Sequence, residues 1–186
     1  RSISRTYTSV FLMEKKTIFD MGRDTVEQFK ARPKIPLTVV LDNVRSLNNI
    51  GSIFRTADGF ACREVVLCGI SATPPSPEIH KTALGAEDSV DWRYFPTTAE
   101  AVSTLRAEGC RIACLELVRE SVSLADFRVE PGVAYALVVG HEVEGIDPAI
   151  VDGADLCIEI PQYGTKHSLN VAVSTAIALW EFAKQM

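Results

Sequence analysis

The sequence predicts an α/β domain whose mostly parallel sheet is covered by helices on both faces. Uninterrupted apolar runs, such as residues 37–41 and 135–139, alternate with stretches in which apolar residues recur every three or four positions. Strands of a parallel sheet are buried on both faces and therefore read as continuous apolar runs, with crossover helices between them. A length of 186 residues suits one domain of this kind.

The expected elements alternate along the chain from residue 37 onward. Strands are expected at residues 37–41, 64–68, 91–95, 111–115, 135–139 and 156–160. Helices are expected at residues 50–61, 78–84, 98–108 and 169–184, and a short one begins at Pro148. One face of the last helix carries apolar residues at helical spacing: Leu169, Val173, Ala176, Ile177 and Trp180. Ahead of the sheet, residues 10–31 have a weak helical pattern that Pro33 and Pro36 end.

Charge divides the chain into a basic beginning and an acidic remainder. Residues 1–34 contain eight lysines and arginines against four acids, whereas the whole chain has a net charge of −5. We therefore predict a basic N-terminal extension at residues 1–36 and a single domain at residues 37–186. The extension is either a solvated helix face or an arm that contacts a polyanion, because phosphate contacts require lysine or arginine.

Composition argues against several classes of protein. The five cysteines form no C-x-x-C pair and the three histidines are scattered, so we expect no metal site. Cysteines within apolar runs suit inert core thiols in a reducing cytoplasm. The apolar runs are far shorter than the ~20 residues that span a bilayer, and no secretory signal is visible, so we expect a cytoplasmic protein without membrane contact. The absence of G-x-G-x-x-G and of a phosphate loop disfavours nicotinamide and nucleoside-triphosphate enzymes.

The loop after the first expected strand carries two candidate functional residues. Ligands of parallel sheets bind at the carboxyl ends of the strands, so polar residues there are of interest. Asn49 is a candidate N-cap for the helix that follows, and Arg55 lies six residues further on. A guanidinium near a helix start suits a phosphate. The alternative interpretation is a capped helix with an exposed arginine.

Two later loops have the same position relative to their strands. In the first of them, Gly140 and Gly145 bracket Glu142, which suggests a tight loop where backbone approaches a ligand. In the second, small polar residues around Ser168 lead into the last helix. Ser168 is either the N-cap of that helix or part of a site. A nucleophilic serine is disfavoured, because no G-x-S-x-G elbow is present.

Together the three loops resemble the three motifs of the SpoU (TrmH-like) family of RNA methyltransferases. The N-x-G-x-x-x-R-T-A motif is matched by Asn49, Gly51, Arg55, Thr56 and Ala57. The G-x-E-x-x-G-[LI] motif is matched by Gly140, Glu142, Gly145 and Ile146. The I-P-x-x-G-x-x-x-S-L-N-V motif is matched in full by residues 160–171. The resemblance runs from about residue 37 to the end of the sequence.

The resemblance implies features that the apolar pattern alone does not predict. Members of the SPOUT superfamily thread the C-terminal segment through a loop, which gives a deep trefoil knot. They bind S-adenosylmethionine in the knot, act as homodimers on RNA and require no metal. The implied cofactor-binding residues are Leu115, Gly140, Ile160, Ser168 and Leu169.

The resemblance also implies catalytic roles, carried over residue by residue. Arg55 would meet an RNA phosphate and help to remove or accept the 2′-hydroxyl proton, although phosphate orientation and charge stabilisation are physically easier roles for an arginine. Asn49 would position Arg55 or the ribose. Glu142 would orient the arginine, while Ser168 and Asn170 would shape the methyl-transfer pocket. The implied activity is methylation of a ribose 2′-hydroxyl in tRNA or rRNA. Two alternatives remain: a knotted methyltransferase that modifies a base, and a non-catalytic RNA-binding protein of the same fold.

Overall fold

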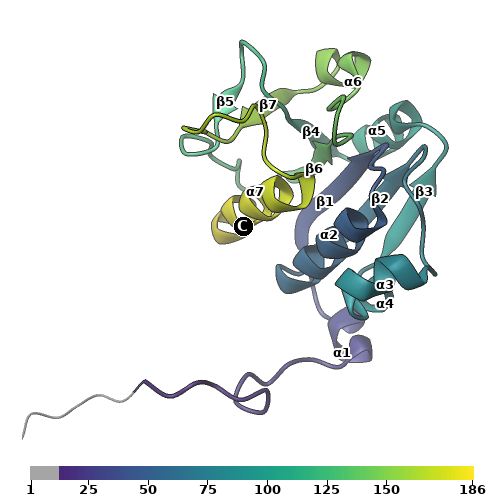
Figure 1. Ribbon diagram of the computed structural model, residues 1–186, viewed down its shortest axis with the longest axis vertical. Coiled ribbons are helices and arrows are strands. Elements are labelled where there is room, and N and C mark those ends of the chain that lie inside the picture. The colour runs from purple at the N-terminus through teal and green to yellow at the C-terminus, as the bar shows by residue number, and fades with distance from the viewer. Residues whose placement is uncertain (1–12) are drawn as a thin grey trace, which may run out of the picture.

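A seven-stranded parallel sheet forms the centre of the molecule in a computed structural model that describes residues 13–186 (Figure 1). In chain order the strands are β1 (Ile35–Asp42), β2 (Cys62–Cys68), β3 (Trp92–Phe95), β4 (Cys110–Leu115), β5 (Val122–Ser123), β6 (Ala134–Val139) and β7 (Leu156–Glu159). Across the sheet their order is β3-β2-β1-β6-β4-β7-β5, and each neighbouring pair is parallel. The predicted α/β class is confirmed. The two-residue strand β5 was missed because it is too short to produce an apolar run.

Helices cover both faces of this sheet, as predicted. They are α1 (Val26–Ala31), α2 (Leu47–Gly59), α3 (Pro77–Ala83), α4 (Ala86–Ser89), α5 (Thr98–Ala107), α6 (Pro148–Asp152) and α7 (Val171–Gln185). One core cluster contains buried residues of α1 to α4 and α7, and the other contains buried residues of α5 and α6. Alternate residues of β1 divide between the two clusters, because successive side chains of a strand point to opposite faces. Val39 and Leu41 belong to the first cluster, and Val40 belongs to the second.

The segment ahead of the sheet differs from the expected weak helix. The predicted helix at residues 10–31 is wrong for residues 13–25, and its first three residues lie outside the described part. A turn closes at residues 17–20, where the Asp20 carboxylate accepts a bond from the Thr17 N–H, and Gly22 has φ +54°. α1 starts only after Thr25, which forms a capping box with Gln28. Residues 13–24 therefore run away from the sheet (Figure 1).

The last helix turns a different face to the core than its apolar stripe suggests. Its buried residues are Thr175, Ala178, Leu179 and Phe182. The stripe predicted from the sequence points to solvent instead: Val173 is 51 % exposed, Ile177 40 % and Trp180 57 %. The helix is apolar on nearly all sides, so its periodicity does not identify the buried face. Within residues 13–186, no helix has the length and apolar character needed to cross a bilayer.

Gly51 allows α2 to pack closely against α3. A Cβ atom at this position would lie 2.1 Å from Thr82 Oγ1 and 2.3 Å from the Ile79 carbonyl oxygen. Thr82 is itself held by a 2.8 Å bond to the Asn48 carbonyl, so it is not free to move. The motif glycine is therefore required by helix packing. It places the first turns of α2 at a fixed distance from α3.

We expect Gly51→Ala to destabilise the fold by about 2 kcal/mol, because overpacking forces the two helices apart. Gly59→Ala is the matched control in the same helix, since no atom of residues 13–186 lies within 4 Å of a Cβ built there. The control should be neutral or slightly stabilising, because alanine favours helix more than glycine does. Urea unfolding of both variants measures the difference. Equal stability of the two variants would contradict the close packing.

Candidate functional site

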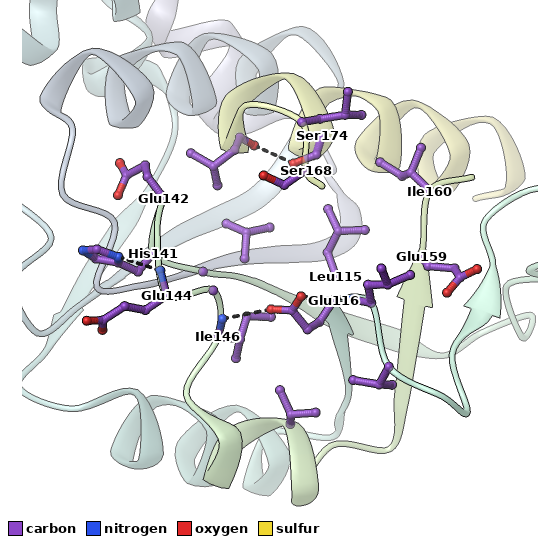
Figure 2. A pocket seen from close by; sticks show the side chains of 18 of the residues that line it. Leu115, Glu116, His141, Glu142, Glu144, Ile146, Glu159, Ile160, Ser168 and Ser174 are labelled. Atoms are coloured by element: carbon purple, nitrogen blue, oxygen red, sulfur yellow. Dashed lines mark hydrogen bonds between the residues drawn. The ribbon is translucent and has the colours of Figure 1, made fainter. Parts of the chain in front are cut away.

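An open cavity of about 820 Å³ lies at the carboxyl ends of β4, β6 and β7 (Figure 2). Its walls come from the loops that follow these strands and from the start of α7. Seven residues predicted from the sequence line it: Leu115, Gly140, Glu142, Ile160, Ser168, Leu169 and Asn170. These include every residue that the resemblance implies for cofactor binding. Asn49 and Arg55 do not line it.

Glu142 ties the loop after β6 to the loop before α2. Its carboxylate accepts bonds from the Ser46 N–H at 2.8 Å, the Arg45 N–H at 3.0 Å and the Asn49 side-chain amide at 3.3 Å. Burial alone would raise the pKa of this carboxyl. The hydrogen bonds from the two backbone N–H groups and from Asn49 outweigh burial and hold the pKa below its ordinary value. The residue was expected to orient Arg55, but its observed partners all precede that arginine.

Asn49 and Asn170 connect the first motif to the third. The Asn170 amide donates to Asn49 Oδ1 at 3.2 Å, and Asn170 Oδ1 accepts from the N–H groups of Ala172 and Val173. Asn170 is therefore the N-cap of α7, so the suggestion that Ser168 caps it is wrong. The suggestion that Asn49 caps α2 is also wrong, because Ser46 accepts the bond from the Asn49 N–H. Since Ser46 caps the helix, the Asn49 side chain can bridge Glu142 and Asn170.

The loop at residues 140–146 is closed by contacts that leave no room for larger side chains. A Cβ at Gly140 would lie 2.4 Å from the Gly145 carbonyl carbon, and Gly145 has φ +72°. The His141 N–H donates to the Gly145 carbonyl at 3.1 Å, and the Gly145 N–H donates to the His141 carbonyl at 2.9 Å. The two motif glycines are thus explained by close approach and by backbone conformation. The result is a rigid loop whose backbone faces the cavity.

Two residues that support this loop were missed in the sequence. His141 Nδ1 accepts bonds from the N–H groups of Val143 and Glu144, both at 3.2 Å. Glu116 accepts a 3.1 Å bond from the Ile146 N–H (Figure 2). Glu116 directly follows β4, so a search of every strand end for polar residues would have found it. No pattern identifies His141, because its role depends on the folded shape of the loop.

Arg55 lies outside this arrangement in a single chain. It is exposed on α2, and among residues 13–186 its side chain has neither a salt bridge nor a hydrogen bond. The structure therefore brings together the side chains of Glu142, Asn49 and Asn170. Arg55 lies on the same helix as Asn49, and its side chain has no partner among the described residues. The guanidinium remains available for a phosphate.

The lining of the cavity is acidic. Five of its residues carry a carboxylate: Glu116, Glu142, Glu144, Asp152 and Glu159. Within residues 13–186, no lysine or arginine lines the cavity. Apolar walls are supplied by residues such as Val139, Ile146 and Ile158. The surroundings therefore favour a ligand with positive charge and apolar parts. In the described part of the chain, no group of three His, Cys, Asp or Glu side chains is arranged to hold a metal ion.

We expect Glu142→Gln to lower the free energy of unfolding by about 1 kcal/mol near pH 7, because an amide cannot accept all three bonds. The pKa of Glu142 is lowered by folding, so its stabilising effect is present above the ordinary value of 4.5 and is lost as the pH falls through the folded value. The difference between wild type and variant should therefore shrink in acid. Urea unfolding along a pH series measures it.

Glu144→Gln is the control for this experiment. Glu144 is an exposed neighbour whose carboxylate has no hydrogen-bond partner among the described residues. Its replacement should leave stability unchanged at every pH. An equal effect of both substitutions would show that the three bonds to Glu142 contribute nothing specific.

Known proteins resemble this chain in both sequence and structure. The SpoU rRNA Methylase family matches residues 36–180. A tRNA (guanosine(18)-2′-O)-methyltransferase from Aquifex aeolicus is 34 % identical over 152 residues, which cover 80 % of this chain and 69 % of the relative. A relative of the same name from Thermus thermophilus is 30 % identical, over 88 % of this chain and 82 % of the relative. Other curated relatives are longer, and the chain spans 61 % of one and 41 % of another.

Solved structures lead to the same family. The AdoMet-bound rRNA methyltransferase from Sinorhizobium meliloti matches with a TM-score of 0.76 at 27 % identity, over 83 % of this chain and 58 % of that chain. The family match covers most of the sequence, including the three loops that carry the motifs, two of which line the cavity. By sequence and by fold, this chain belongs to the SpoU rRNA Methylase family.

Proposed function

We propose that this chain is an S-adenosylmethionine-dependent RNA methyltransferase that acts on a ribose 2′-hydroxyl of tRNA or rRNA. The main support is the hydrogen-bonded connection of Glu142, Asn49 and Asn170, which joins the first motif to the two motif loops that line the cavity. Relatives that are at least 30 % identical are named as tRNA 2′-O-methyltransferases. The choice between tRNA and rRNA is left open by the relatives, whose names include both.

The cavity fits the proposed cofactor in charge and in lining. S-adenosylmethionine carries a sulfonium cation, and the carboxylates inside the cavity favour positive charge. We propose that Leu115, Gly140, Ile160, Ser168 and Leu169 hold it, since all five line this space. When bound, the cofactor supplies an activated methyl group. The protein contributes the rigid backbone of the loop at residues 140–146 and the apolar walls. Among the described residues, no lysine or arginine lines the cavity.

In the proposed mechanism, Arg55 binds the phosphate next to the reacting ribose. Arginine side chains stay protonated, so phosphate orientation and charge stabilisation suit Arg55 better than removal of a proton. Asn49 lies on the same helix two turns earlier and fixes the start of α2 through Glu142. Ser168 and Asn170 shape part of the cavity wall. Alignment of the hydroxyl with the methyl donor supplies much of the rate in such a site.

We propose that the active form is a homodimer. Arg55 does not line the cavity of its own chain, so a second copy is one way to bring a guanidinium to it. The exposed stripe of α7 offers an apolar surface for that copy, with Trp180 packed against Phe60 at 5.8 Å between ring centroids. Isolated exposed apolar residues are ordinary, but a row of them on one helix is typical of an interface.

Three further expectations remain proposals. We propose that the C-terminal segment is threaded as a trefoil knot; the position of β7 between β4 and the earlier strand β5 is consistent with such threading. We propose that residues 1–36 are a basic extension that contacts RNA, ahead of the methyltransferase domain at residues 37–186. The free state of all five cysteines is consistent with work in the cytoplasm.

Arg55→Ala should reduce methyl transfer at least about 100-fold, because a phosphate contact made in the transition state is lost. Cofactor affinity should stay within a few-fold, since Arg55 lies outside the cavity. The assay uses labelled cofactor and total RNA from cells that lack the protein, followed by identification of the methylated nucleoside. Retained activity in the variant would remove the proposed catalytic centre. A methylated base, or cofactor-free RNA binding without transfer, would favour one of the two alternatives.

Ile177→Glu should weaken the dimer at least about tenfold, because it buries a charge in the proposed apolar interface. Ile70→Glu is the control: Ile70 is 62 % exposed in the loop after β2, away from α7. Sedimentation velocity over a range of concentrations measures the association. A monomeric wild type, or an Ile177→Glu dimer as tight as wild type, would contradict the proposed interface.

A further inference from the structure

Most cations of the domain are already occupied by partners within it. Residues 35–186 contain eleven lysines and arginines. Five of them form salt bridges: Lys81, Arg93, Arg106, Arg111 and Lys184. Arg128 donates to the backbone carbonyls of Ala125 and Phe127. The other five have no side-chain partner within residues 13–186: Arg45, Arg55, Arg63, Arg119 and Lys166.

Three of these cations lie on loops at the edge of the sheet that carries the cavity, and each adjoins a residue of the cavity lining. Arg45 follows β1, and its N–H is 3.0 Å from the Glu142 carboxylate that lines the cavity. Arg119 follows β4 and adjoins Val118 of the cavity lining. Lys166 follows β7 and adjoins His167 of the lining. All three are exposed, and they come from three separate loops at the same edge of the sheet.

The charge of the cavity lining has the opposite sign. Among the described residues the lining contains five carboxylates and neither lysine nor arginine, so it disfavours a phosphodiester. Cations around the mouth attract phosphates to the rim and leave the interior to a cationic ligand. Apart from the proposed basic extension at residues 1–36, the chain is acidic and has few other places to bind RNA.

We propose that Arg45, Arg119 and Lys166 form a basic rim that binds the phosphates of the RNA substrate across the cavity mouth. This inference rests on the proposed function, because it identifies how that RNA is held. The rim is distinct from Arg55: it binds flanking phosphates, whereas Arg55 serves the phosphate beside the reacting ribose. Binding by the rim is electrostatic and therefore falls as salt concentration rises.

Single alanine substitutions at the three rim positions test the proposal. Filter binding of purified tRNA and rRNA fractions is measured at several salt concentrations, with cofactor-saturated protein. Each substitution should weaken binding about 3- to 10-fold and reduce the slope of log affinity against log salt by ~0.7–0.9. The triple variant should bind at least about 100-fold more weakly. Calorimetry with S-adenosylmethionine should give wild-type affinity within about twofold, which also shows that each variant is folded.

Arg63→Ala is the matched control. Arg63 is an exposed arginine without a partner in the described chain. It lies at the start of β2, where the amino ends of the strands lie, whereas the cavity lies at their carboxyl ends. Its replacement should change affinity less than about twofold and leave the salt slope unchanged. An effect equal to that of the rim substitutions, or unchanged slopes in the rim variants, would overturn the proposal.

The experiment also separates this inference from the proposed function. A wild-type protein that binds cofactor but neither RNA fraction overturns the rim and leaves the cofactor site standing. A wild-type protein that binds RNA but no cofactor contradicts the methyltransferase, while its salt slopes still decide for or against the rim. Where the wild-type protein binds RNA, charge reversal at all three positions should abolish that binding.

Discussion

The arrangement of the site depends on the carboxylate of Glu142. It accepts bonds from two backbone N–H groups before α2 and from the Asn49 amide, and so joins segments nearly one hundred residues apart. A helix start leaves N–H groups without partners, and a carboxylate that accepts bonds there is favoured by the helix dipole as well. The lowered pKa of Glu142 expresses the same preference, because the ionised form makes the bonds. The contact helps to fix the start of α2, the helix that carries Arg55, together with the close packing of Gly51 against α3.

Asn170 extends the connection to the third motif. Its Oδ1 caps α7 while its amide donates to Asn49, so one side chain serves both a helix start and a link between loops. Aspartate would cap the helix equally well, but it has no N–H to give to Asn49. The amide is therefore needed for the link and not for the cap. Through it, the loop that lines the cavity at residues 160–170 is coupled to the helix that carries Arg55.

The sequence predicted the sheet well and orientations poorly, and two of the predicted site residues, Asn49 and Arg55, do not line the cavity. Buried strands produce apolar runs that are independent of their neighbours, so β1, β4 and β6 were placed within two residues. Asn49 and Ser168 were candidate caps of α2 and α7, but Ser46 and Asn170 cap them, because several polar residues precede each helix and only the backbone geometry selects one. The buried face of α7 was not predictable from a helix that is apolar on most sides. The role of His141 depends on loop closure and has no local signal.

Opposite charge at the rim and in the interior resolves a conflict between the two proposed ligands. A sulfonium donor requires negative surroundings, whereas RNA is a polyanion that such surroundings repel. If basic residues lined the cavity, they would favour RNA and disfavour the donor. In this proposal, carboxylates in the cavity lining and cations without a partner among the described residues, on the loops after β1, β4 and β7, let one edge of the sheet accept both. The net acidity of the chain is then compatible with RNA binding, because what matters is which cations remain free of internal partners and where they lie.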